Sequence, residues 1–325
     1  MASGSKKVIY AALIGNTVIA ISKFIAAVFT GSSAMLSEGV HSLVDTGNQV
    51  LMLHGLSRAS KSPDKKHPFG YGMELYFWAF VVAILIFSLG SGISFYEGIK
   101  HIQHPEPIKD PFWNYAVLAV SLAFEGWAWT VAFREFKRGI GKAGFWRSIR
   151  RSKDPTIFTV LFEDTAAMMG LIVAFVGIFL AGLLEIPELD GAASVVIGVI
   201  LASVAVILAI ECKGLLIGEG ASAEVTEGIR EIVSENKNII SLNELLTMHL
   251  GPNDILVNVS LDFADSLTSV EVEAAISTFE KRIKAKYSDV TRVFIEAQSL
   301  SAHKRAIVQT HSGTDLPETG TPSDN

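Results

Sequence analysis

The stretch AMLSEGVHSLVDTGNQVLMLHGL, residues 34–56, decides how this chain folds. It is long enough to cross a membrane, because about 20 mostly apolar residues span roughly 30 Å of hydrocarbon. It also carries Glu38, His41 and Asp45, so a strict hydropathy count scores it poorly. Whether this stretch spans the membrane therefore fixes the number of spans and the side on which each loop lies.

Five other segments have the length and apolar character of membrane spans, and one of them also carries acidic residues, Glu163 and Asp164. We expect six transmembrane helices in all. Their approximate ranges are 8–30, 34–56, 75–97, 112–133, 156–184 and 190–211.

The basic residues of the loops support this count, because short cytoplasmic loops hold the excess of Lys and Arg. Eight basic residues lie from Arg134 to Lys153, and four lie in the loop after the second segment. The loops on the other side hold Lys100 and Lys109. Removing the second or the fifth segment would put strongly basic loops on both sides. We therefore expect a multi-pass integral membrane protein with both termini in the cytoplasm, and a bacterial inner membrane is the expected location.

Composition agrees with a membrane portion joined to a soluble portion. Half of the 325 residues are hydrophobic and the mean hydropathy is +0.40, which is too apolar for an ordinary soluble domain. The net charge of -6 argues against a nucleic-acid-binding protein. The single cysteine, Cys212, excludes an internal disulfide and a cysteine-based zinc cluster. No signal peptide is expected, because the apolar run after Lys6 and Lys7 is too long.

Beyond Gly214 the pattern becomes that of a small α+β domain. We expect helices over 222–236 and 268–287 and strands over 240–250, 254–263 and 290–297. The predicted domains are a membrane domain at 1–213, a cytoplasmic domain at 214–300 and a disordered tail at 301–325, which is polar and rich in Ser, Thr, Gly and Pro.

His41 and Asp45 are the first candidate metal ligands. They are four residues apart, which places them one turn apart on one face of a helix. An imidazole and a carboxylate at this spacing form a half-site suited to zinc, manganese or ferrous iron. A buried hydrogen-bonded pair that holds two membrane helices together explains the same pattern equally well.

The fifth segment adds Asp164 and Glu163, which point about 100° apart around their helix. We favour Asp164 as a ligand because Ala167 and Gly170, near its face, allow a close approach of the second segment. Glu163 either completes the metal shell, hydrogen-bonds His41, carries protons, or forms an ion pair with a basic residue such as Lys23.

Three more polar residues lie at membrane depth. Glu125 relays protons, admits the cation, or makes an interhelical hydrogen bond, and Asn16 is a further polar group. Lys23 lies near enough to the end of its segment to extend its ammonium to the interface, so we assign it no role.

Taken together, these residues resemble the cation diffusion facilitators, a family of proton-coupled exporters of zinc and related metals. The similarity covers residues 8 to about 300. It rests on GSSAMLSE (31–38) leading into the His41 and Asp45 pair, HPFGYG (67–72), Pro105-x-Pro107, and Asp164. The stretches LFEDTAA (161–167) and LAFEG (122–126) are most similar to the branch that contains the mitochondrial zinc exporter of animals.

The resemblance implies a transport site formed by His41, Asp45 and Asp164, with Glu163 as a further candidate ligand, and a ferredoxin-like cytoplasmic domain through which two protomers associate. It also implies that protons compete with the metal for its ligands, with His41, Asp45 and Glu125 as candidate coupling residues. One departure is Val160, which stands where the family commonly has a histidine. Zinc is the favoured cargo, and manganese or iron is compatible with a single-histidine site.

The residues and the resemblance together predict a transporter that exchanges a divalent metal for protons, with no enzymatic activity and no prosthetic group. Export from the cytoplasm, as the direction of transport, is implied by the resemblance alone. The alternative is a non-transporting membrane sensor or scaffold that acts through its soluble domain. Such a protein would not need His41, Asp45 and Asp164 to converge. An intramembrane metalloprotease is not supported, because the sequence has no His-Glu-x-x-His motif.

Overall fold

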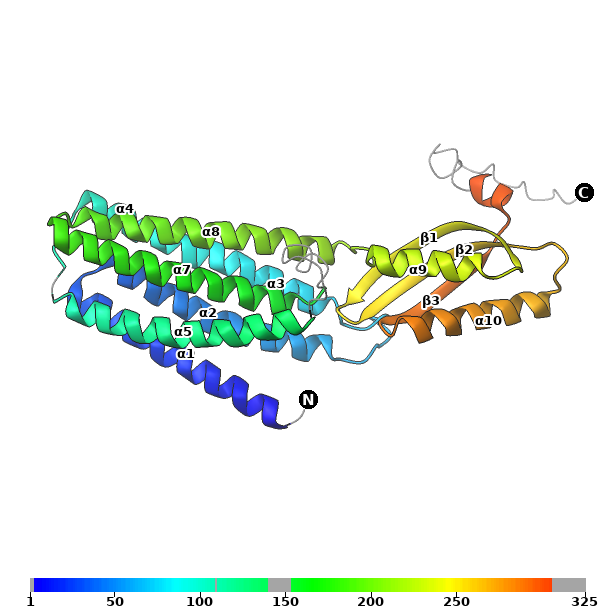
Figure 1. Ribbon diagram of the computed structural model, residues 1–325, viewed down its shortest axis with the longest axis horizontal. Helices are drawn as coiled ribbons and strands as arrows, with labels where there is room; N and C mark the ends of the chain where they lie inside the picture. Colours follow the sequence, from blue (N-terminus) through cyan, green and yellow to red (C-terminus); the bar gives the residue numbers. More distant parts are fainter. Residues whose placement is uncertain (1–2, 109, 140–152, 306–325) are drawn as a thin grey trace, which may run out of the picture. The chain divides into compact units, whose positions relative to one another are not determined.

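The computed structural model describes residues 3–108, 110–139 and 153–305 (Figure 1). The chain divides into two compact units, and the first ends at Gly218 and the second begins at Glu219. The predicted boundary at 213 falls a few residues earlier, because the last helix of the first unit continues to Leu216. The rest of the chain, including most of the predicted disordered tail, lies outside the described residues.

The first unit is helical, and its helices cover the segments predicted from the sequence. The third segment contains a short π-helical stretch, η1 (Ile86–Ser91), between two α-helices. The α-helices are α1 (Ser3–Thr30), α2 (Ser33–Ala59), α3 (Glu74–Leu85), α4 (Gly92–Gln103), α5 (Phe112–Gly139), α7 (Pro155–Leu184) and α8 (Glu188–Leu216).

Within the described residues, three helical segments are long and apolar enough to cross a membrane: Glu74–Gln103, Phe158–Leu184 and Glu188–Leu216. In α1 the apolar portion is the shorter stretch Asn16–Thr30. The polar side chains of α2, among them Glu38 and Asp45, lower its hydropathy. The first unit is thus a helical domain with three apolar helices.

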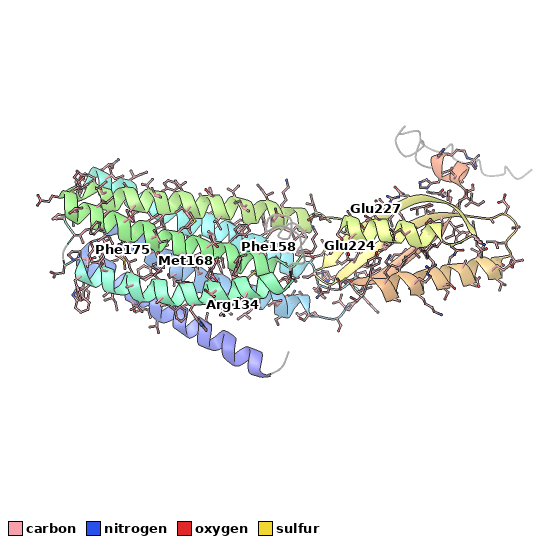
Figure 2. The ribbon with its side chains drawn as sticks, in the orientation of Figure 1. Arg134, Phe158, Met168, Phe175, Glu224 and Glu227 are labelled. Carbon is pink, nitrogen blue, oxygen red and sulfur yellow. The ribbon has the colours of Figure 1, made fainter. Side chains whose placement is uncertain are left out.

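The side chains of α7 show how this unit meets its surroundings. Phe158 is 1% exposed, whereas Phe175 on the same helix is 47% exposed, so α7 has both a buried part and an uncovered apolar part (Figure 2). On α9 (Ala223–Ser234) of the second unit, the exposed side chains include Glu224 and Glu227 instead. Apolar exposed surface suits lipid, and charged exposed surface suits water.

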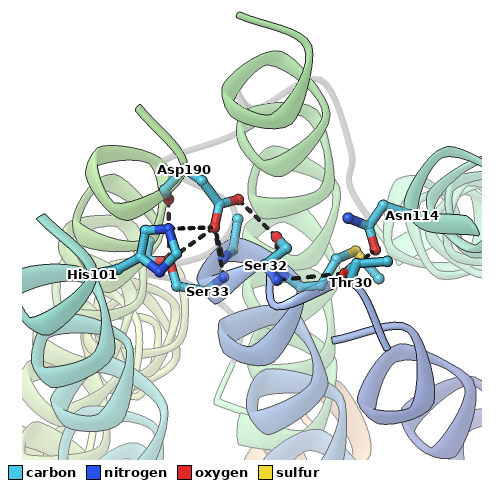
Figure 3. A network of polar contacts seen from close by, with 9 residues as sticks. Thr30, Ser32, Ser33, His101, Asn114 and Asp190 are labelled. Carbon is cyan, nitrogen blue, oxygen red and sulfur yellow. Dashed lines mark hydrogen bonds and ion pairs between the residues drawn. The ribbon is translucent and has the colours of Figure 1, made fainter. Parts of the chain in front are cut away.

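The turn between α1 and α2 is attached to the start of α8 by the carboxylate of Asp190 (Figure 3). One of its oxygens accepts hydrogen bonds from the backbone N–H of Ser33 at 2.5 Å and from its hydroxyl at 3.0 Å, and the other accepts from the Ser32 hydroxyl at 2.7 Å. His101 of α4 lies 3.8 Å from the same carboxylate. A buried carboxylate with several donors fixes this end of the bundle.

Helices α4 and α8 approach each other closely at two glycines. A Cβ atom added to Gly98 would lie 2.8 Å from the carbonyl oxygen of Gly191, and a Cβ added to Gly191 would lie 2.8 Å from that of Gly98. Small residues allow this kind of backbone approach in membrane helix pairs.

The second unit has the predicted order of helix, strand, strand, helix, strand. Its elements are α9, β1 (Ile239–Gly251), β2 (Asp254–Phe263), α10 (Ser269–Lys286) and β3 (Val290–Ala297). The sheet order is β1-β2-β3, with β1 and β2 antiparallel and β2 and β3 parallel. Helices α9 and α10 contact each other and the sheet, so they share one face of it.

Alternation along β2 builds the core of this unit. Its inward side chains pack with those of α9 and α10, which include Ile229, Phe279 and Ile283. The inward residues of β2 are Ile255, Val257, Val259 and Leu261. One expectation was wrong: residues 301–305, predicted to be the start of the disordered tail, are helical and include His303, which is 7% exposed.

Candidate metal centre

The two predicted ligands of α2 lie together. Nδ1 of His41 is 3.3 Å from Oδ1 of Asp45, and their side chains are 1% and 15% exposed. The angles do not make this contact a hydrogen bond, and neither ring nitrogen of His41 has a hydrogen-bond partner among the described residues. In a neutral imidazole one of these nitrogens carries a proton, and the other has a lone pair that can bind a metal.

Four carboxylates line one small cavity in the first unit. The cavity has a volume of about 20 Å³, which is room for roughly one water molecule or one ion. Helices α1, α2, α5 and α7 contribute to its wall. The lining residues are Asn16, Ser42, Asp45, Gln49, Glu125, Val160, Glu163 and Asp164.

This cavity unites most of the residues predicted from the sequence. Asp45, Asp164, Glu163 and the proton-coupling candidate Glu125 all line it. His41 does not line the cavity, but it contacts Asp45, which does. Over the described parts of the chain, no three His, Cys, Asp or Glu side chains are close enough to hold a metal ion together. In this conformation the candidate ligands are neighbours around a cavity and do not form a closed shell.

Glu163 is held by α2. Its Oε1 accepts a hydrogen bond of 2.8 Å from Nδ2 of Asn48, and its side chain is buried. The ion pair to Lys23 that we considered is therefore wrong. The structure also records no hydrogen bond between Glu163 and the ring of His41. The Asn48 contact fixes Glu163 at the cavity wall.

Lys23 does not extend to the membrane interface as predicted. It is fully buried, and its ammonium donates to Oε2 of Glu38 at 3.0 Å and to the Ser42 hydroxyl at 2.8 Å. Sequence reasoning gave Glu38 no role, although its position three residues before His41 on the same helix was a usable signal. The pair joins α1 to α2 directly beside the candidate metal ligands.

The loop before α3 contains a second cluster of polar groups. The Asp64 carboxylate accepts hydrogen bonds from the Tyr71 hydroxyl at 2.7 Å and from the backbone N–H groups of His67 and Lys66. The Tyr71 hydrogen bond is the largest cause that holds the pKa of Asp64 below its ordinary value. His67 helps to order the loop through its backbone N–H, which donates to Asp64 at 2.7 Å.

Comparison with known proteins gives a family match over most of the first unit. The family described as "Cation efflux transmembrane domain" matches residues 9–217. These residues contain every candidate metal ligand named above.

Several curated proteins are similar to this chain. The human mitochondrial proton-coupled zinc antiporter SLC30A9 is 32% identical over 262 residues, which are 80% of this chain and 46% of that protein. The cation-efflux pump FieF of Escherichia coli is 25% identical over 81% of this chain and 83% of the relative. The manganese efflux system protein MneP of Bacillus subtilis is 21% identical over 90% and 95%. The chain spans about half the length of its animal relatives.

Proposed function

Because this chain belongs to the cation efflux family, also called the cation diffusion facilitators, we propose that it exports a divalent transition metal from the cytoplasm in exchange for protons. The observation that carries the proposal is the cavity at which Asp45, Asp164, Glu163 and Glu125 meet, beside His41. Carboxylates at membrane depth are costly and usually mark an ion pathway, and a bound divalent cation would offset their mutual repulsion.

The transport site is formed by His41, Asp45 and Asp164, with Glu163 as an additional ligand. A small rotation of α2 against α7 would bring His41 toward the cavity and complete the shell. Zinc is the proposed cargo, because a relative 32% identical to this chain is named a zinc antiporter. Manganese or iron remains compatible, because Val160 leaves the site with a single histidine and several carboxylates.

Proton coupling follows from the chemistry of the ligands. A carboxylate or imidazole must lose its proton before it binds a metal, so protons and metal compete for His41 and Asp45. Glu125 lines the same cavity and can pass a proton to or from them. If the cavity opens to each side in turn, this competition drives metal out as protons enter.

The architecture proposed with this function has six membrane spans and both termini in the cytoplasm. Helices α1, α2 and α5 would then cross the bilayer with the three apolar segments, which buries the polar face of α2 inside the bundle. The second unit is proposed to be a ferredoxin-like domain that pairs two protomers. Relatives in two bacteria support a bacterial inner membrane as the location.

Metal flux in proteoliposomes tests the function. Vesicles that contain the purified chain and an internal metal-sensitive dye receive Zn²⁺, Mn²⁺ or Fe²⁺ with and without an imposed pH gradient. We expect flux that rises with the gradient and is greatest for Zn²⁺. Gradient-independent flux would contradict the exchange mechanism. If no metal moves through the folded native chain, the sensor or scaffold function replaces transport.

A further inference from the structure

The polar face of α2 continues past the candidate metal centre. Glu38 lies three residues before His41, and Asp45 lies four residues after it, so the three side chains follow one another along one face. Exposure falls in the same order: Asp45 is 15% exposed, His41 1% and Glu38 0%. The three side chains therefore run from the partly exposed Asp45 at the cavity to the fully buried Glu38.

Glu38 and His41 both have unused ligand atoms. Within the described part of the chain, Oε1 of Glu38 and the two ring nitrogens of His41 are buried without a hydrogen-bond partner. A buried polar atom without a partner costs free energy, and it is expected where a ligand binds for part of the working cycle. Glu38 and His41 therefore carry ligand atoms without partners one helical turn apart on α2.

The second oxygen of Glu38 is occupied by a cation that belongs to the chain itself. The Lys23 ammonium lies 3.0 Å from Oε2 of Glu38 and 2.8 Å from the Ser42 hydroxyl. Ser42 also lines the carboxylate cavity, so this ammonium is separated from the cavity by a single side chain. In this conformation Glu38 of α2 is therefore paired with a positive charge, the Lys23 ammonium of α1.

The chemistry of the pair suits a metal. A Glu and a His three residues apart, both projecting into a helix bundle, are a known metal-ligating arrangement. Carboxylate oxygen and imidazole nitrogen together accept zinc, manganese and iron. Gly170 of α7 faces this carboxylate, and a methyl group there would overlap Oε1 of Glu38.

We propose that Glu38 and His41 form a second cargo site, in which the Lys23 ammonium stands in for the metal. His41 is shared with Asp45, so a metal ion passes along α2 from Asp45 through His41 to Glu38 when the Lys23 ammonium leaves. This proposal rests on the proposed transport function, because the ion bound at Glu38 is the cargo of the cavity.

Equilibrium Zn²⁺ binding to the full-length protein in detergent tests the site without measuring transport. The background is the variant Asp45→Asn/Asp164→Asn, which removes the two carboxylate ligands proposed for the cavity. Adding Lys23→Met vacates Glu38, and we expect Zn²⁺ affinity to rise by about tenfold, because the metal no longer competes with the ammonium for the carboxylate. Adding Glu38→Gln or His41→Ala to that protein should return the affinity to the background value.

The test is decided by whether the gain in Zn²⁺ affinity depends on Glu38. If Lys23→Met raises affinity but Glu38→Gln leaves it high, or if Lys23→Met has no effect in a folded protein, the second site is wrong. Should the Met variant not fold, Lys23→Gln vacates Glu38 while keeping a polar group beside Ser42, and the same comparison applies. Failure of the native chain to move metal would contradict the proposed function, whereas Glu38-dependent Zn²⁺ binding would still stand.

Discussion

The ammonium nitrogen of Lys23 lies 3.0 Å from Oε2 of Glu38, and both side chains are fully buried. The pair connects α1 to α2 one helical turn from His41. An isolated buried charge is unstable, so each member of the pair requires the other. A lysine inside the helical unit is thereby tolerated, and its charge lies next to the groups that we propose to bind the cargo.

The contact between Gly170 and Glu38 predicts that enlarging this glycine destabilises the protein, because Lys23 holds the other oxygen of the Glu38 carboxylate in place. Gly170→Ala would drive a methyl group into Oε1 of Glu38, and overpacking of this kind costs about 1–3 kcal/mol. We expect a lower melting temperature in detergent and slower metal flux. Gly182→Ala on the same helix is the matched control, because a Cβ there meets no atom within 4 Å. Equal effects of the two substitutions would contradict this packing.

A substitution at Val160 is predicted to change the metal preference. It lines the carboxylate cavity one turn before Asp164, so Val160→His adds an imidazole beside the proposed ligands. Imidazole favours zinc over manganese, and we expect the ratio of Zn²⁺ to Mn²⁺ affinity to rise by about tenfold. Competition binding with both metals measures the ratio. An unchanged ratio would show that residue 160 lies outside the coordination shell.

The loop that contains Asp64 is predicted to loosen in acid. The pKa of Asp64 in the folded protein lies below its ordinary value, chiefly because the Tyr71 hydroxyl donates a hydrogen bond to this carboxylate. The loop contacts are therefore fully present above the unfolded value of about 3.9 and are lost as the pH falls through the lower folded value. Tyr71→Phe should raise the pKa of Asp64, so the loop loosens at a higher pH. Carboxyl ¹³C NMR titration of Asp64 measures this, and an identical midpoint in the variant would contradict it.

Much of the fold could be predicted because it follows from local patterns. The ranges of the long helices follow from apolar length, and the strands β2 and β3 follow from alternation within a few residues. The spacing of His41 and Asp45 placed them on one helix face, where the structure brings them together. Asp164 faces the same cavity as Asp45, as the small residues near it suggested.

The remaining features depend on how the helices are rotated against one another. The position of Lys23 near the end of its segment suggested that it reaches the interface, but its side of α1 faces α2, so it pairs with Glu38. Glu163 was open to several partners, and Asn48 became its partner because α2 and α7 are in contact. Asp190 drew no attention in the sequence, although it holds the turn between α1 and α2 (Figure 3).

The most direct test of the proposed function is proton-driven Zn²⁺ flux in proteoliposomes for the native chain, Asp45→Asn, Asp164→Asn and the control Glu106→Gln. Glu106 is an exposed carboxylate that does not line the cavity, so its loss should leave flux at the native rate. We predict that each aspartate variant, although folded, loses nearly all gradient-dependent flux, because a missing ligand breaks the metal site. Native flux in either aspartate variant would contradict the proposed transport site.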